Sequence, residues 1–517
     1  MKSVFEKMSY YLMVLGIAFV LVQCDSDDET EMVPQPDPET EVEGITLKPG
    51  MDLCGIISDQ DGNPVSGVVV TDGFSCVLTD SDGIYQMKKD NEAKFVYYST
   101  PADYKVATYS ETNNVAKFYT KLSAGKRYDF KLEKLPVVET EFTLTAIGDP
   151  QPYSSADFNR FNAETIEDLS DYFNGWSEPV YSIVLGDLVS DSPGLYGQMH
   201  YALGTTNMTT FTAIGNHDKT AQSNKDLPRT SEKYMSTFGP VNYSFNRGDV
   251  HFVCLDNVIY SNSSSYSGGF LTQQIAWLQA DLSHVSKDKM IIVYYHIPLR
   301  GSESIINRNR FLQSLEGFAE VHLMSGHTHY NENFEIVSQV QAYEHVHAAA
   351  CGSWWKSTIN GDGTPNGYAV YEISGATIKN WYYKPTFLAP EFQIRLHKGD
   401  AVFGGSNGFY SYDLAANSII ANVWNADKNW KIEAYEDGVK VANLTRLSDS
   451  LRDAWSLGYH IGVLNRNPKN YSPPSKHLFL HRMVNSEAEL EIRATDPFGN
   501  VYKQNEIVSD YSSAVSY

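Results

Sequence analysis

Five apolar runs in the middle of the chain each end in acidic, amide or imidazole side chains. They read FTLTAIGDPQ, VYSIVLGDLVSD, TTFTAIGNHD, KMIIVYYHIP and VHLMSGHTH, in this order between residues 142 and 329. Buried strands of an α/β domain appear in a sequence as nearly continuous apolar runs of this kind. Because the loops at the ends of such strands carry the site, the runs predict both the fold and the place of the functional residues.

Helical patterns lie between the runs. In the segment 155–174 the apolar residues fall largely on one helical face: Phe158, Phe161, Ile166, Leu169, Tyr172 and Phe173. Two further helices are predicted over 271–282 and 303–316. Alternation of strand, loop and helix predicts an α/β domain over residues 137–385.

The two flanks of this domain lack a helical period. Between residues 48 and 136, Asp-Gly pairs at 61–62, 72–73 and 82–83 separate short Val- and Ile-rich runs, which is typical of antiparallel strands joined by tight turns. The stretch GIISDQDGNPVSGVVVTDG resembles the carboxypeptidase-regulatory-like, transthyretin-like sandwich. After residue 385, Asp-Gly at 437–438 and alternating runs such as LEIRAT again predict strands. We therefore expect all-β sandwiches over 48–136 and 386–517.

The first 24 residues have the form of an export signal. Lys2 and Lys7 precede an apolar run over 10–22, which is shorter than the ~20 residues that cross a bilayer. The following Leu-Val-Gln-Cys resembles the lipobox of bacterial lipoproteins, although Gln23 stands where Gly, Ala or Ser is usual. We expect a lipoprotein signal peptide over 1–24 and lipidation of Cys24, which would anchor the protein to a membrane of the cell envelope (outer membrane, periplasmic or surface-exposed). An ordinary cleaved signal or an uncleaved anchor is the alternative.

The acidic residues are unevenly distributed. The net charge is −23, and residues 25–43 hold nine Asp or Glu and no Lys or Arg. A segment of this composition cannot build a core, so a disordered acidic tether is expected over 25–47. It also resembles the surface-export signals of some Gram-negative lipoproteins, while a solvated linker explains it equally well. The overall charge argues against a nucleic-acid partner, because phosphate backbones require a basic face.

Four cysteines follow Cys24. Cys54 and Cys76 lie in one predicted sandwich and are candidates for a disulfide, which an envelope protein permits. Cys254 and Cys351 lie in apolar surroundings and are expected to be buried thiols. No CxxC spacing is present, so the sequence does not predict a cysteine-based zinc site.

The polar ends of the five runs supply oxygen and nitrogen donors: Asp149, Asp187, Asn216, His296, His327 and His329. Each alone has a plainer explanation, a hydrogen-bonded histidine or an aspartate that caps a turn. As an ordered set they favour two neighbouring divalent ions, Mn, Zn, Fe or Mg. Two such ions bind a phosphoryl group and lower the pKa of a shared water, which is the chemistry of phosphoester hydrolysis.

The order GDPQ, GDLVSD, GNHD, a lone His after a strand, and GHTH resembles the calcineurin-like metallophosphoesterase superfamily over residues 142–330. The blocks NVWNADKNWKIEAYEDG and ELEIRATDPFGNVY resemble the C-terminal domain of its bacterial lipoprotein members. The resemblance implies a four-layer α/β/β/α sandwich and two metal ions bridged by Asp187. It implies that Asp149 and His329 bind the first ion, and that Asn216, His296 and His327 bind the second. His217 would assist the leaving group, oriented by Asp218 or Asp191.

Two positions depart from the superfamily pattern. Gln151 stands where a histidine is usual, and a neutral amide oxygen is a weaker ligand, so the first metal site is expected to be weaker or completed by water. Ser190 stands where Asp or Asn is usual, and we expect the adjacent Asp191 or the loop backbone to compensate.

The implied activity is hydrolysis of phosphomonoesters or phosphodiesters by a metal-bridging hydroxide outside the cytoplasm. The acidic surface favours a small phosphoester over a polymeric one. The alternative is a catalytically weak or silent surface lipoprotein that acts as a binding module, with Gln151 as the sign of a decaying site.

Two adjacent tryptophans, Trp354 and Trp355, lie in the glycine-containing segment CGSWWKSTINGDG after the last ligand block. Aromatic faces in this place are suited to wall a substrate pocket. Packing against the C-terminal sandwich is an equal alternative, and Trp176 is open to the same two interpretations.

Overall fold

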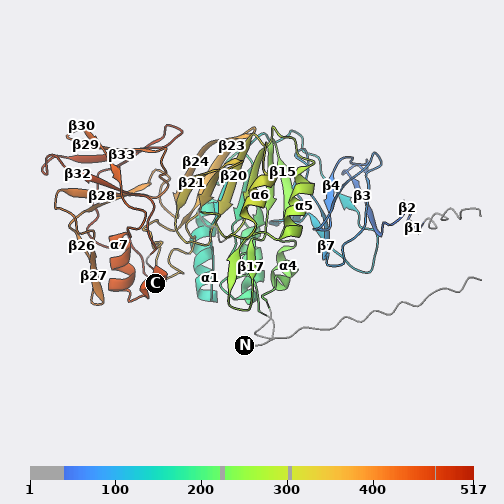
Figure 1. Ribbon diagram of the computed structural model, residues 1–517, viewed down its shortest axis with the longest axis horizontal. Helices are drawn as coiled ribbons and strands as arrows, with labels where there is room; N and C mark the ends of the chain where they lie inside the picture. Colours follow the sequence, from blue (N-terminus) through green and yellow to red (C-terminus); the bar gives the residue numbers. More distant parts are fainter. Residues whose placement is uncertain (1–39, 222–227, 301–304, 472, 517) are drawn as a thin grey trace, which may run out of the picture.

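A computed structural model describes residues 40–221, 228–300, 305–471 and 473–516 (Figure 1). The proposed signal peptide and the lipidation site Cys24 lie outside the described residues. Three regions follow one another along the long axis of the molecule: the N-terminal strands, a central region of strands and helices, and the C-terminal strands. Among the described residues, no helix combines the length and the apolar character needed to cross a membrane.

The central region contains two large sheets. In spatial order the first consists of β24 (Thr377–Pro385), β23 (Gly367–Ser374), β12 (Glu141–Ile147), β13 (Val180–Val184), β14 (Thr209–Thr212), β9 (Asn113–Ala116) and β8 (Thr108–Ser110). The second consists of β15 (Tyr243–Arg247), β16 (Val250–Cys254), β19 (Met290–Tyr294), β20 (Glu320–Ser325), β22 (Gln341–Val346) and β21 (Glu332–Val337). The five apolar runs form β12, β13, β14, β19 and β20, and each is paired in parallel with a neighbouring strand.

The two sheets bury one core between them. Leu144 and Ile183 of the first sheet belong to the same buried cluster as Phe252 and Ile292 of the second. A run such as MIIVY in β19 is buried along its whole length because residues of both faces are covered. This accounts for the unbroken apolar runs in the sequence.

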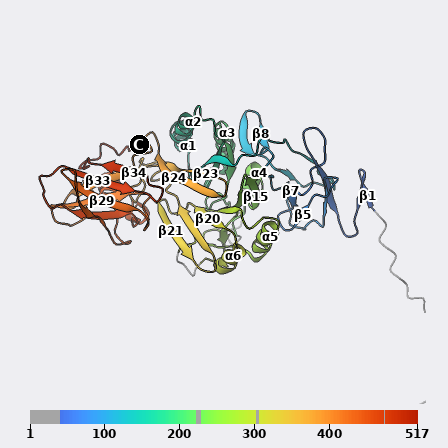
Figure 2. The same ribbon diagram turned by 90° about the horizontal axis from the view of Figure 1, so that it is seen from above.

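Helices cover the outer faces of both sheets (Figure 2). Over the first sheet lie α1 (Ser155–Phe161), a π-helical turn (Asn162–Ile166), α2 (Glu167–Tyr172), α3 (Tyr196–Gly204) and α4 (Glu232–Phe238). Over the second lie α5 (Thr272–Leu282) and α6 (Arg308–Ser314). The three predicted helical segments are therefore present. Ser154 begins the first of them with a capping box, in which its hydroxyl accepts from the backbone N–H of Asp157.

The N-terminal region holds a four-stranded and a three-stranded sheet. The first consists of β10 (Tyr119–Lys121), β7 (Phe95–Tyr98), β4 (Val69–Thr71) and β5 (Cys76–Leu78), and the second of β11 (Phe130–Lys131), β3 (Leu53–Ser58) and β6 (Ile84–Met87). The segment 48–136, over which a sandwich is predicted, is strand-rich, but not all of its strands belong to these two sheets. The hairpin β8–β9 leaves it and extends the central sheet, with Val115 of β9 opposite Thr210 of β14 in parallel.

The structure also decides two open points in the N-terminal region. The candidate disulfide is not formed, because Cys54 and Cys76 are free thiols that face different cores. The last part of the segment 25–47, where a disordered tether is expected, is instead ordered, because β1 (Thr40–Val42) and β2 (Ile45–Leu47) form a hairpin; residues 25–39 lie outside the described residues. Ile45 and Leu47 are buried beside Cys54, and this apolar contact orders the segment.

The C-terminal region contains two four-stranded sheets that share a buried core. One consists of β25 (Ile394–Lys398), β28 (Ser418–Val423), β32 (Leu478–Arg482) and β31 (Thr445–Arg446), and the other of β30 (Val439–Asn443), β29 (Lys431–Glu436), β33 (Leu490–Thr495) and β34 (Val501–Gln504). The sequence patterns did not predict the helical turns of this region, α7 (Ala454–Leu457), the π-helical Gly458–Val463 and α8 (Pro468–Tyr471), which accompany the hairpin β26 (Val402–Gly405) and β27 (Gly408–Ser411).

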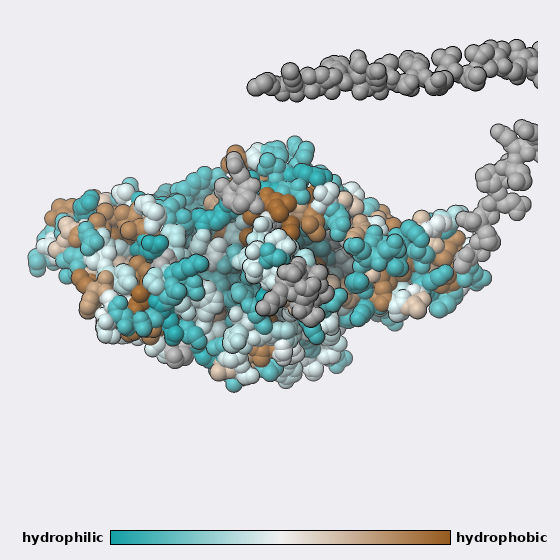
Figure 3. Space-filling model, turned by 60° about the horizontal axis from the view of Figure 1, so that its bottom comes forward, coloured by the Kyte–Doolittle hydropathy of each residue, from teal (hydrophilic) through white to brown (hydrophobic). Residues whose placement is uncertain are grey.

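The surface is predominantly hydrophilic on the face that Figure 3 shows, and its hydrophobic patches there are small and separate. A broad apolar docking surface is therefore absent from that face of the described residues.

Candidate active site

The loops that follow the five central strands converge at one edge of the two sheets. They carry Asp149 after β12, Asp187 after β13, Asn216 after β14, His296 after β19 and His327 after β20. All but His327 are buried, and His327 is half-buried. Because parallel strands deliver their carboxyl ends to one edge, residues up to 178 positions apart in sequence come into hydrogen-bond contact here.

Left-handed backbone is concentrated in these loops. Asp149, Asp187 and His327 have φ values of 40°, 50° and 69°, and the same region of φ is occupied by Gln151, Asp191, His329, Trp354 and Trp355. Each such residue costs about 1 kcal/mol or more, and the surrounding structure must impose it. A cluster of strained residues at converging loops marks a place where side-chain position has been favoured over local stability.

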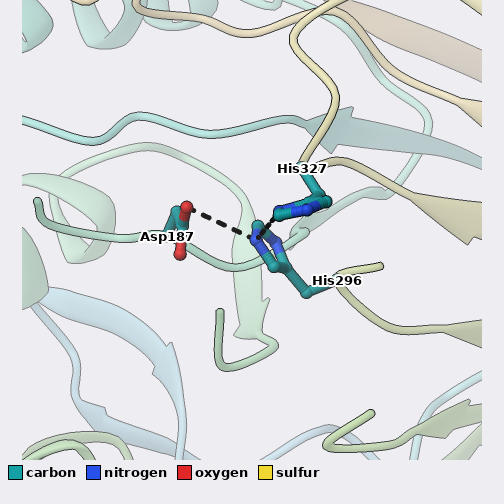
Figure 4. Close-up of side chains that lie close together, drawn as sticks. All are labelled: Asp187, His296 and His327. Carbon is teal, nitrogen blue, oxygen red and sulfur yellow. Dashed lines mark hydrogen bonds and ion pairs between the residues drawn. The ribbon is translucent and has the colours of Figure 1, made fainter. Parts of the chain in front are cut away.

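The first group of side chains, the His296 group, consists of Asp187, Asn216, His296 and His327. The His296 Nε2 atom lies 2.9 Å from the Asn216 Oδ1 atom, 3.3 Å from a carboxylate oxygen of Asp187 and 3.2 Å from the His327 Nδ1 atom. Figure 4 shows Asp187, His296 and His327 directed toward one another. One potential ligand atom from each of these three lies within 4.8 Å of the others, which is a spacing that suits a common metal ion.

The tautomer of His296 is fixed by its second nitrogen. Its Nδ1–H donates to the carbonyl oxygen of Leu185 at 2.9 Å, and a carbonyl can only accept. The Nε2 atom therefore faces the acceptors of Asn216 and Asp187 and must satisfy them with a proton or with a shared cation. Burial lowers the pKa of His296, but the neighbouring Asp187 outweighs burial and raises it to about 9. Burial and the charge of His296 lower the pKa of His327 to about 4, which favours the neutral imidazole that a metal ion requires.

The second group, the His329 group, consists of Asp149, Gln151 and His329. The Asp149 carboxylate lies 3.4 Å from His329 Nε2 and also accepts the backbone N–H of His327. Gln151 donates its amide N–H to Asp187 at 3.0 Å, while its Oε1 atom is buried without a donor. Burial would lower the pKa of His329, yet Asp149 raises it well above the usual value. A buried amide oxygen without a donor, on a side chain that also contacts the Asp187 carboxylate, is an acceptor that a cation would satisfy.

The donor set therefore fits the two divalent ions that the sequence predicts. The His296 group offers two imidazoles, one amide oxygen and one carboxylate, and the His329 group offers one imidazole, one carboxylate and one amide. Asp187 joins the two groups, since it contacts both His296 and Gln151. Burial opposes ionisation of Asp187, but the imidazoles around it outweigh burial and hold its pKa below the usual value. Mixed nitrogen and oxygen donors suit Mn, Zn, Fe or Mg.

His217 lies at the edge of this site and is about one-third exposed. Its Nδ1 atom lies 2.7 Å from Asp191, and its backbone N–H donates to Asp187 at 2.8 Å. Burial lowers the pKa of His217, but the hydrogen bond to Asp191 and the charges of Asp187 and Asp191 outweigh burial and raise it. His217 is thus placed beside the candidate metal ligands, where a raised pKa favours the role of a proton donor.

The structure separates the two carboxylates that were candidates to orient His217. Asp191 does so, because its left-handed backbone directs its side chain to the imidazole. Asp218 instead is buried and accepts the backbone N–H groups of Leu188, Val189 and Gly215. Asp218 is therefore not the carboxylate that contacts the His217 ring, and its own carboxylate fixes the loops that carry Asp187 and Asn216.

Asp191 is held from its other side by Arg229, which sequence reasoning missed. The Arg229 guanidinium donates to Asp191 at 2.5 Å and to the carbonyl oxygen of Lys219 at 2.8 Å. Ser190, in the position that departs from the superfamily pattern, is tied to the loop by a backbone hydrogen bond to Pro152. No motif surrounds Arg229 in the sequence, so only the fold reveals this contact.

The two adjacent tryptophans have different roles. Trp355 is buried, donates its indole N–H to the carbonyl oxygen of Pro150 at 2.8 Å and packs on the guanidinium of Arg160. Trp354 lies over His329, with ring centroids 4.6 Å apart, and lines a cavity of about 460 Å³ that also borders His217 and His327. Trp354 is therefore a pocket residue, whereas Trp355 is a core residue beneath the loop of Asp149. Trp176, the third tryptophan left open, packs on Phe173 away from this cavity.

Three segments of the chain match families of known proteins. Residues 142–331 match the family Calcineurin-like phosphoesterase, residues 51–135 match N terminal of Calcineurin-like phosphoesterase, and residues 344–502 match C terminal of Calcineurin-like phosphoesterase. The three segments occur in the expected order. A search of curated proteins found no match.

Several solved structures show distant similarity to the chain. A dimetal phosphatase from Danio rerio is 14% identical, with coverage of 47% of this chain and 96% of that chain and a TM-score of 0.34. A purple acid phosphatase from yellow lupin (Lupinus luteus) seeds is 12% identical, with coverage of 55% and 51% and a TM-score of 0.30. A 5'-nucleotidase from Candida albicans is 14% identical, with coverage of 47% and 51% and a TM-score of 0.30.

These similarities are too weak to carry an argument, so the assignment rests on the matched segments and the ordered ligand blocks. The chain belongs to the calcineurin-like phosphoesterase superfamily, and its class is that of the metal-dependent phosphoric ester hydrolases.

Proposed function

We propose that the protein hydrolyses small phosphomonoesters or phosphodiesters with two divalent ions, one held by the His296 group and one by the His329 group, with Asp187 shared between them. The observation that carries the proposal is the convergence of Asp187, Asn216, His296 and His327 beside His217. The same convergence makes a silent binding module the weaker alternative, because only position 151 departs from the usual ligands.

The ions would supply Lewis-acid chemistry, in that they bind the phosphoryl oxygens and lower the pKa of a shared water. The residues of the chain do the rest. Asp187 is kept ionised by the imidazoles around it, and Leu185 holds the His296 ring in the tautomer whose Nε2 atom faces the site.

His217 delivers a proton to the oxygen of the leaving group. Asp191 orients its imidazole through Nδ1, which directs Nε2 away from Asp191, and Arg229 holds Asp191 in place. A proton donor that is positioned in this way typically contributes about 10²–10⁴-fold to the rate.

The wider setting of the enzyme is also proposed. The stacked helix, sheet, sheet and helix layers support a four-layer α/β/β/α domain over 137–385 between flanking sandwiches. The sequence of residues 1–24 supports lipidation of Cys24 and a location in the cell envelope, outside the cytoplasm. The net charge of −23 supports small substrates over nucleic-acid polymers.

The test is the substitution Asp187→Asn, which keeps the shape of the side chain and removes its charge. Turnover of an aryl phosphate with Mn supplied should fall by about 10²–10³-fold or more, the range that one positioned electrostatic group contributes to catalysis. Metal content, measured by mass spectrometry, should fall with it. The exposed Asp171→Asn on α2 is the matched control.

Equal turnover by the Asp187→Asn protein and the wild type would refute the mechanism. Wild-type protein that binds no transition metal and turns over no phosphoester would favour the binding-module alternative.

A further inference from the structure

The cavity beside the metal site is closed on one side by the C-terminal region. Lys469, Asn470 and Pro473 line it together with His217, His327 and Trp354 of the central region. Its volume of about 460 Å³ lies within the range of about 300–1,000 Å³ that is usual for small-molecule pockets. The C-terminal region thus contributes side chains to the place where the leaving group of a substrate must lie.

An aromatic wall faces this cavity. Trp354 is stacked on His329 at an interplanar angle of 30°, and Tyr471 of α8 meets Trp354 edge-on with ring centroids 5.1 Å apart. These two contacts fix the indole beside the candidate metal ligands. The backbone of Trp354 is left-handed, with a φ of 49°. A planar group on a substrate would find a rigid apolar surface here.

The described lining of the cavity contains a lysine and three histidines but no acidic residue. The lysine, Lys469, is exposed. The Lys469 ammonium forms no ion pair with any described residue. In a chain with a net charge of −23, an unpaired lysine at the mouth of a pocket free of carboxylates favours a second negative charge on the ligand.

We propose that this cavity selects phosphoesters whose leaving group combines a planar ring with a second anionic group, where Trp354 contacts the ring and Lys469 contacts the anion. The inference rests on the proposed phosphoesterase activity and specifies its substrate class. Lys469 is then a specificity residue supplied by the C-terminal region.

The test compares 4-carboxyphenyl phosphate with its methyl ester, which differ by one negative charge. The ratio of kcat/KM for the acid to that for the ester is measured for the wild type, Lys469→Ala and Lys469→Glu. Relative to wild type, the ratio should fall about fivefold in Lys469→Glu and by less in Lys469→Ala, the effect of one exposed charge pair. Because each protein acts on both substrates, differences in folding, metal loading and leaving-group chemistry cancel in the comparison.

Lys503→Glu on β34 is the matched control, because it places the same charge change on an exposed lysine outside the cavity. If Lys469→Glu changes the ratio no more than Lys503→Glu, the assignment of Lys469 is refuted although the phosphoesterase proposal stands. If wild type hydrolyses neither ester when Mn, Zn, Fe or Mg is supplied, the proposed function fails and this inference fails with it.

The ring contact is tested separately with phenyl phosphate and ethyl phosphate. Trp354→Leu should reduce the preference for the aryl ester, and Trp354→Phe should retain it. Loss of the preference in both variants, or in neither, would refute the role of the aromatic wall. Metal content is measured in each variant, because Trp354 also contacts His329.

Discussion

The two halves of the candidate metal site, the His296 group and the His329 group, differ in the number and spacing of their potential ligand atoms. In the His296 group, the His296 Nε2 atom lies within 3.3 Å of a potential ligand atom on each of Asp187, Asn216 and His327. In the His329 group, Asp149 and His329 are 3.4 Å apart, and Gln151 leaves its oxygen buried without a partner. The difference teaches that one ion should be held firmly by two imidazoles, a carboxylate and an amide oxygen, while the other has only one imidazole, one carboxylate and an amide.

The largest expected effect follows from removing an imidazole from the stronger half. Loss of a residue that only orients a metal ligand typically lowers metal affinity or activity by about 10–100-fold. Because His296 is itself a candidate ligand, His296→Ala should lower metal affinity and turnover by more than about 100-fold. His329→Ala should release one ion and leave the ion of the His296 group bound. Metal content after dialysis and turnover of an aryl phosphate are the measurements.

The exposed His284→Ala serves as the control for both variants. If His329→Ala loses both ions and His296→Ala loses only one, the ranking of the two halves is the reverse of the one described here.

A smaller effect is expected from adding an imidazole to the weaker half, the His329 group. Gln151→His replaces the amide with an imidazole at a position whose φ of 44° histidine tolerates better than most residues. Metal affinity of the weaker ion should rise about tenfold, because imidazole is the stronger ligand. Titration of the metal-depleted protein with Mn, followed by turnover, measures it.

Gln273→His on α5 is the control, since it adds an exposed histidine away from the site. Unchanged or weaker Mn affinity in Gln151→His would show that the amide does not limit this half.

The smallest effect concerns the stability of the protein beneath the stronger half, the His296 group. Glu344 is buried beneath it and accepts hydrogen bonds from the Tyr295 hydroxyl, the Leu299 backbone and the Ser325 hydroxyl, which connect the ends of β19 and β20. Burial raises the pKa of Glu344 to about 7. The carboxyl group of Glu344 therefore binds a proton more tightly in the folded state than in the unfolded state. The resulting contribution to the free energy of unfolding is fully present below pH ~4.5 and is lost as pH rises through 7.

Glu344→Gln removes this titration. Between pH 4.5 and 7 the free energy of unfolding of the wild type should fall by up to about 3 kcal/mol relative to that of the variant. Urea unfolding at several pH values measures it, and the exposed Glu316→Gln is the control. Parallel pH profiles for Glu344→Gln and the wild type would contradict the assignment.

The sequence predicted the central strands and their polar ends well, for a physical reason. A strand buried on both faces must be apolar throughout, so a polar side chain at its end is conspicuous, and parallel pairing brings such ends together. Asp149, Asp187, Asn216, His296, His327 and His329 were found in this way.

Contacts made by tertiary structure alone were not predictable. Asp218 directly follows His217 in the GNHD block and Asp191 ends the GDLVSD block, and only the structure shows that Asp191 is the one that reaches the His217 ring. Arg229 and Lys469 lie in segments without any motif. The hairpin β8–β9 is short and largely polar, and it becomes a sheet edge only because β14 offers it a partner.

That hairpin limits how the chain can be divided. The boundary between residues 136 and 137 separates the families that the segments match, yet a cut there would remove two strands from the catalytic sheet. β14 would become an edge with unpaired backbone groups, and such edges promote aggregation. In evolution, the N-terminal region can therefore be exchanged between proteins only under one of two conditions. Either its replacement brings a hairpin that pairs with β14, or β14 changes so that it is stable as an edge strand.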